Sequence, residues 1–110
     1  MEKSLTALAH EQLDKAKAGS GGRSAATVYG GREHILRQTV LALVGGSALD
    51  SHESPGEATI QVLVGRVRLT SGDDAWTGEA GDLLVIPPAR HGLEALEDSA
   101  VLLTVAKSDR

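Results

Sequence analysis

The sequence predicts an all-β domain preceded by one short helix. Beyond residue 22, apolar residues fall into short runs rich in valine, leucine and isoleucine, and glycine- or aspartate-containing turns separate these runs about every 8 to 12 residues. No helical pattern separates the runs, which disfavours a parallel α/β fold. A chain of 110 residues is expected to form one domain.

The predicted helix occupies residues 4–18. Ser4 is a suitable N-cap, and glycines at 19, 21 and 22 end the helix and form a hinge. We therefore divide the chain into an N-terminal helix and hinge, residues 1–22, and a β-barrel, residues 23–110. The apolar stripe that should dock the helix consists of Leu5, Leu8, Ala9, Gln12, Leu13 and Ala16.

Six strands follow from runs of β-branched and leucine residues between turn signals. The predicted strands are Ala25–Tyr29, Ile35–Val44, Thr59–Val64, Val67–Thr70, Leu83–Ile86 and Val101–Val105. The last is apolar at nearly every position, so both of its faces should be covered. One face would line the barrel and the other would meet the helix or a second subunit, which predicts a homodimer.

Composition excludes several classes of partner. The net charge is −4, and Tyr29 and Trp76 are the only aromatic residues, so neither a nucleic acid nor a membrane surface is an expected partner. The absence of cysteine removes disulfides and thiol catalysis. The N-terminus lacks the apolar core of a signal peptide, and we expect a soluble cytoplasmic protein.

Two segments that begin with a glycine each contain a histidine. Gly46 is followed after five residues by His52, and Gly65 lies downstream on the same segment. Gly81 is followed after five residues by Pro87, and then by His91. Histidines on separate strands of a small barrel could meet inside it.

These segments resemble the two motifs of the cupin superfamily, G-x5-H-x-H-x3–4-E-x6-G and G-x5-P-x-G-x2-H-x3-N. The resemblance covers about residues 34–105 and implies a double-stranded β-helix, a jelly-roll-like barrel with a cavity between two antiparallel sheets. This chain differs from the two motifs at several positions. Ser54 and Ala58 replace the second histidine and the glutamate, Ala89 replaces a glycine, and His91 comes one residue early. Only two of the four usual metal ligands remain.

The early histidine is expected to face the barrel interior. If the preceding turn is one residue shorter, His91, Leu93 and Ala95 alternate inward and Glu94 points outward. The other register would bury Glu94 without a partner, which is costly.

The predicted ligand pocket therefore contains His52 and His91, with His34 and Gln38 as polar neighbours and Val62 and Leu93 as apolar walls. The resemblance allows a divalent transition metal as cofactor, held by His52, His91 and, as a weaker candidate, Glu57. A set of His34, His52 and His91 would form a three-histidine site. The main hypothesis is a cupin that binds an unassigned small molecule at an eroded metal site. The alternatives are a metal-dependent oxygenase or isomerase using His52 and His91, and a ligand sensor or dimerisation module.

Overall fold

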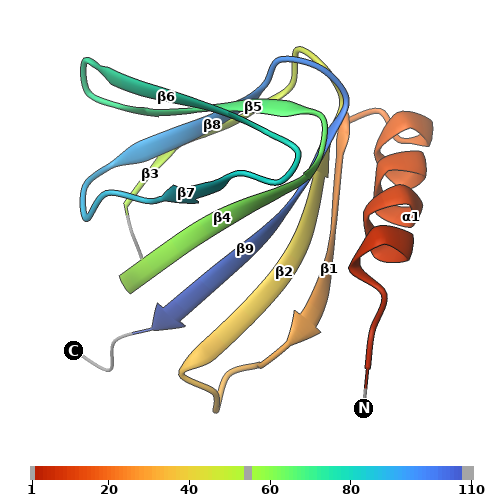
Figure 1. Ribbon diagram of the computed structural model, residues 1–110, viewed down its shortest axis with the longest axis horizontal. Coiled ribbons are helices and arrows are strands. Elements are labelled where there is room, and N and C mark those ends of the chain that lie inside the picture. The colour runs from red at the N-terminus through yellow and green to blue at the C-terminus, as the bar shows by residue number, and fades with distance from the viewer. Residues whose placement is uncertain (1, 54–55, 108–110) are drawn as a thin grey trace.

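The computed structural model describes residues 2–53 and 56–107, which form one helix and two facing antiparallel sheets (Figure 1). The helix α1 spans Leu5–Ala18. The strands are β1 (Arg23–Tyr29), β2 (Leu36–Leu43), β3 (Ala48–His52), β4 (Gly56–Val64), β5 (Arg66–Ser71), β6 (Asp74–Glu79), β7 (Leu83–Val85), β8 (His91–Ala95) and β9 (Ser99–Lys107).

The two sheets have the orders β1-β2-β9-β4-β7 and β3-β8-β5-β6. We call them the five-stranded and the four-stranded sheet. Their neighbouring strands are antiparallel throughout, and β9 lies in the centre of the five-stranded sheet between β2 and β4. This arrangement of two antiparallel sheets confirms the predicted barrel class.

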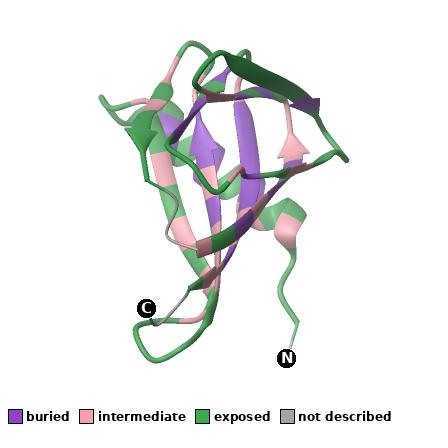
Figure 2. Cartoon of the chain, turned by 90° about the vertical axis from the view of Figure 1, so that its left-hand side faces the viewer, coloured by how far each residue is buried: buried purple, intermediate pink, exposed green. Residues whose placement is uncertain are grey.

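An aliphatic core fills the space between the sheets. Figure 2 shows the buried residues of the strands in purple. Alternate residues of each strand point into this space, as the two-residue period of a strand requires. The buried members of the core are Leu43, Ala58, Ile60, Val62, Val67, Leu69, Ile86, Leu93, Ala95, Val101 and Val105.

The helix packs on the outer face of the five-stranded sheet. The Ser4 side chain accepts a hydrogen bond from the Ala7 N–H at 3.1 Å and caps the helix, as predicted. A second apolar cluster joins Ala9, Leu13 and Ala16 of the helix to Ala42 and Ala100 of the sheet. The small alanine side chains allow the helix to lie close to the strands.

All six predicted strands are present, with ends shifted by a few residues. Three strands are not among these six, namely β3 and β8, which carry the motif histidines, and β6. The sequence of β6, DAWTGE, is polar, and all of its residues except Gly78 are exposed. Within the described residues, no helix is long and apolar enough to cross a membrane.

Candidate functional site

The two motif histidines meet on neighbouring strands of the four-stranded sheet. His52 ends β3, His91 begins β8, and the two residues are paired across the ladder. Their ring centroids are 4.5 Å apart, with an angle of 60° between the ring planes. The two glycine-led segments therefore bring their imidazoles together, as the sequence suggested.

A backbone irregularity makes this pairing possible. Leu49 pairs with Leu93, and His52 pairs with His91. Between these two pairs the chain advances by three residues in β3 but by only two in β8. Such a bulge inserts one extra residue and changes the strand face to which the following side chains point. Regular alternation from Leu49 would have put Ser51 opposite His91 and turned His52 to the other face.

The burial of β8 agrees with the expected register. His91, Leu93 and Ala95 are buried, whereas Glu94 is exposed. His91 is only 4 % exposed, so its ring lies at the end of the apolar core. His52 is exposed, and the pair therefore spans the boundary between the core and the solvent.

Hydrogen bonds to the backbone fix the orientation of both rings. Nδ1 of His52 lies 2.9 Å from the carbonyl oxygen of Asp50, and Nδ1 of His91 lies 3.0 Å from that of Ala89. A carbonyl oxygen only accepts, so each Nδ1 must carry the proton and donate it. In a neutral imidazole this leaves a lone pair on Nε2, which can accept a hydrogen bond or bind a metal.

The Nε2 atom of His91 remains accessible despite the burial of the residue. No described residue forms a hydrogen bond with this Nε2 atom. Among the described residues, every completely buried side-chain nitrogen or oxygen has a hydrogen-bond partner. Nε2 must therefore keep some exposed surface. Both imidazoles thus present an available ring nitrogen near the end of the barrel.

Arg90 joins the segments that carry the two histidines. One guanidinium nitrogen donates to the carbonyl oxygen of Ser51 at 2.9 Å, and the other lies 3.4 Å from a carboxylate oxygen of Glu53. The Ser71 hydroxyl donates to the carbonyl oxygen of Arg90 at 2.9 Å. The ion pair is exposed and contributes little stability by itself, but the contacts brace the backbone on both sides of the histidine pair. No pattern in the sequence indicated these contacts of Arg90.

His34 and Gln38 do not join the histidine pair, which corrects the expected pocket. His34 is exposed in the loop before β2, where its ring packs edge-on against Tyr29 with centroids 5.3 Å apart. Gln38 pairs with Thr104, and its side chain donates a hydrogen bond to the Thr104 hydroxyl at 3.2 Å. This is the helix-covered face of the sheet, because Ala42 and Ala100 have the same strand parity.

Glu57 is likewise on the outer face and exposed, because it pairs with Ala106 and alternates with the core residue Ala58. Strand parity therefore separates Glu57 from the two histidines, and its expected weak role as a metal ligand is not supported. Ser54 lies outside the described residues. Among those that are described, no group of three or more histidine, aspartate or glutamate side chains could hold a metal ion.

Val62 and Leu93 are core residues, 1 % and 4 % exposed. Leu93 shares the inner face of β8 with His91. Their role as walls of a ligand pocket remains a prediction.

A hollow of about 820 Å³ lies at the end of the five-stranded sheet where β4 begins and β9 ends. Neither histidine lines it. Its lining residues are Ile35, Gly56, Glu57, Ala58, Thr59, Val85, Ile86, Pro88, Ala106 and Lys107.

Comparison with solved structures identifies the fold. A cupin superfamily protein from Desulfitobacterium hafniense DCB-2 superposes with a TM-score of 0.76 at 14% identity, covering 98% of this chain and 94% of the other. An RmlC-like cupin from Desulfovibrio desulfuricans has a TM-score of 0.66 at 27% identity, covering 76% of this chain and 81% of the other. The chain is a cupin by fold.

An enzyme is also among the similar structures. Salicylate 1,2-dioxygenase from Pseudoaminobacter salicylatoxidans, solved as adducts with gentisate, has a TM-score of 0.73 at 20% identity. The match covers 88% of this cupin but only 30% of the dioxygenase. Neither a protein-family model nor a curated protein sequence matches the chain.

Proposed function

We propose that this cupin binds a small hydroxyl-bearing molecule through the Nε2 atoms of His52 and His91. The observation that carries the proposal is the pair of rings 4.5 Å apart, each with Nδ1 anchored to a backbone carbonyl. Two neighbouring hydrogen-bond acceptors suit a ligand with two donors, such as a diol or a dihydroxybenzene. Leu93, next to His91 on the inner face of β8, would provide apolar contact.

Gentisate is a suitable probe, because it carries two phenolic hydroxyls and is present in the structure of the similar dioxygenase. With ¹⁵N-labelled histidine, we expect both rings to show the Nδ1-protonated form. Gentisate should then shift the Nε2 signals of His52 and His91 in a saturable way. Replacement of the buried ring by a hydrocarbon ring, His91→Phe, should abolish this response.

The matched control is His10→Phe, because His10 is exposed on the helix. It should leave the response unchanged. Protonation at Nε2 of either ring, or a titration that leaves both ring signals in place, would contradict the proposed binding mode.

A metal-dependent oxygenase or isomerase is the second candidate, and it is favoured by the two free Nε2 lone pairs. Protein metal sites of this kind use three or more protein ligands, however, and the described donor set supplies two. The residues present therefore do not fit a metal held by the protein alone. Elemental analysis of protein purified without chelator tests this candidate. Near-stoichiometric metal that is lost in both His52→Ala and His91→Ala would favour it over the binding function.

A ligand sensor or dimerisation module is the third alternative. It predicts that addition of the gentisate probe changes the oligomeric state, measured by analytical ultracentrifugation. Binding without such a change would favour the simple binding protein.

A further inference from the structure

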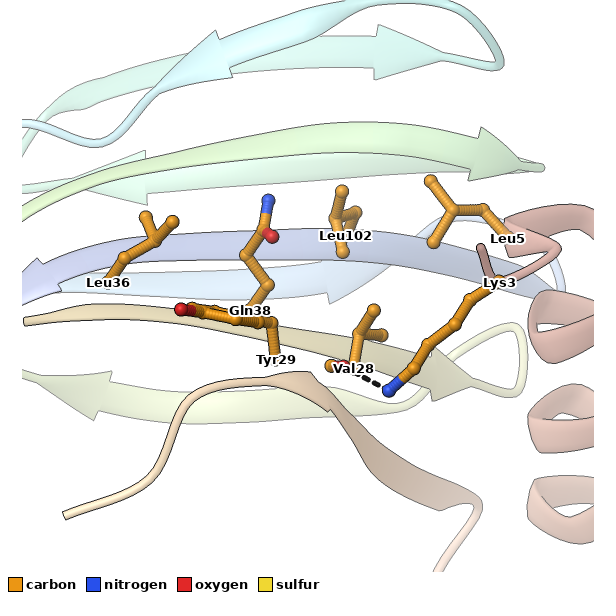
Figure 3. A pocket seen from close by; sticks show the side chains of 7 residues that line it. All are labelled: Lys3, Leu5, Val28, Tyr29, Leu36, Gln38 and Leu102. Carbon is orange, nitrogen blue, oxygen red and sulfur yellow. Dashed lines mark hydrogen bonds between the residues drawn. The ribbon is translucent and has the colours of Figure 1, made fainter. Parts of the chain in front are cut away.

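A second hollow lies on the outer face of the five-stranded sheet, beside the start of the helix. Its volume is about 370 Å³. The strand parity of Gln38 places this hollow on the opposite side of the sheet from the barrel core. Figure 3 shows the lining side chains, which are Lys3, Leu5, Val28, Tyr29, Leu36, Gln38 and Leu102.

The walls of this outer pocket are mostly hydrocarbon. Leu36 and Leu102 come from neighbouring strands of the sheet, Val28 from the edge strand β1, and Leu5 from the first turn of the helix. Leu36 is 43 % exposed and therefore has apolar surface available for a ligand. Cavities of a few hundred cubic ångströms with apolar walls and a small number of polar groups are typical small-molecule sites.

Lys3 supplies a cationic group to the pocket. Its ammonium donates a hydrogen bond to the backbone carbonyl of Val28, which holds the charge beside the apolar walls (Figure 3). The carbonyl is neutral and uses only one of the three donors of the ammonium. The ion pairs of the described residues involve Lys15, Lys17 and Arg90, so the charge of Lys3 has no carboxylate partner there.

Two further polar groups complete the lining. The Gln38 amide is oriented by its hydrogen bond to Thr104, which leaves its second N–H and its oxygen available. Tyr29 is half exposed, and its ring is supported by the edge-on contact with His34. A polar end and a hydrocarbon end are therefore both present in one pocket.

We infer that the outer pocket binds a small monocarboxylate with an apolar tail of about six to eight carbons. The carboxylate would pair with the ammonium of Lys3, and the tail would lie against Leu36 and Leu102. A phosphate-rich ligand does not fit, because one cation faces mostly hydrocarbon. A neutral lipid would leave the ammonium unpaired.

Octanoate is the probe for this inference, with the two-dimensional amide spectrum of the full chain as the readout. We expect saturable shifts centred on Val28, Tyr29, Gln38 and Leu102. Hexanoate should bind about tenfold more weakly, because two fewer methylenes are buried. Lys3→Met keeps the hydrocarbon stem and removes the charge, and should weaken octanoate binding by about two- to fivefold.

Two variants serve as controls. Lys15→Met removes an exposed helix lysine that already pairs with Glu11, and should not change the affinity. His91→Phe disables the proposed histidine site and should leave octanoate binding intact, so the two proposals can fail separately. The inference is overturned if octanoate shifts no pocket residue, if Lys3→Met and Lys15→Met bind it equally, or if self-association of the chain covers the pocket.

Discussion

Gly65 shows how a single residue limits the backbone at a motif position. It has a φ of +84°, and a Cβ added there would lie 2.3 Å from the carbonyl oxygen of Asp98 and 2.4 Å from the hydroxyl of Ser99. The Ser99 hydroxyl also makes two hydrogen bonds with the backbone of Arg66. It accepts one from the Arg66 N–H at 2.9 Å and donates one to the Arg66 carbonyl oxygen at 3.0 Å. No side chain fits between these groups.

We predict that Gly65→Ala lowers the free energy of unfolding by about 3 kcal/mol or more, since positive φ and a backbone clash act together. Gly46→Ala is the matched control. Gly46 has a φ of +91° but nothing within 4 Å of an added Cβ, so the loss should be about 1–2 kcal/mol. Urea denaturation of both variants measures the difference. Equal losses would show that the close approach to Asp98 and Ser99 contributes nothing.

The helix α1 is the element whose attachment can be tested most directly. Leu13 is 6 % exposed and packs against the outer face of the sheet, where Gln12 also accepts a hydrogen bond from the Ser24 hydroxyl. Val44 N–H donates to the carbonyl of Gly22 at 2.8 Å, which ties the end of the glycine-rich connection to the sheet. The helix is therefore packed as part of the domain.

Leu13→Ala should lower the free energy of unfolding by about 2–3 kcal/mol through loss of buried hydrocarbon. Lys15→Ala, on the exposed side of the same helix, should change it by less than about 0.5 kcal/mol. Both values come from urea denaturation followed by circular dichroism. If the two variants were equally stable, the helix would not be docked in solution.

Most elements could be predicted from the sequence because periodic apolar residues decide which segments form strands and which face they bury. It was harder to predict on which face of its sheet a particular side chain lies. Gln38 and Glu57 lie on the outer face, and no local pattern of residues shows which side of a strand will meet the core when both sides carry apolar neighbours. The bulge after Leu49 is also invisible in the sequence, although it decides where His52 points.

At the scale of the whole molecule, the predicted homodimer remains open to test. The helix covers the outer side of β9 at Ala100, and Leu102 is only 7 % exposed, so β9 itself no longer demands a partner subunit. Exposed large apolar side chains occur at several places among the described residues, and two of the most exposed lie on the edge strand β7. Leu83 is 61 % and Val85 is 72 % exposed.

If a dimer forms, we expect it to use this edge, because burial of two adjacent apolar side chains favours association. Sedimentation of the wild-type chain over a wide concentration range should then show a dimer, and Val85→Lys should shift it to the monomer mass. Leu96→Lys changes a residue that is 44 % exposed on the four-stranded side and should have no effect. A wild-type chain that stays at monomer mass would remove the dimer from consideration.

The extra residue between Leu49 and His52 has a wider consequence for how such chains are aligned. A homologous chain that lacked this residue would follow a regular ladder from Leu49 and still set its histidine opposite His91. The number of positions between the first glycine and the imidazole can thus vary by one while the geometry of the two rings stays the same. A sequence motif with a fixed number of positions between the glycine and the histidine would then miss chains in which the two rings still meet. Superposition of their backbones would identify such chains.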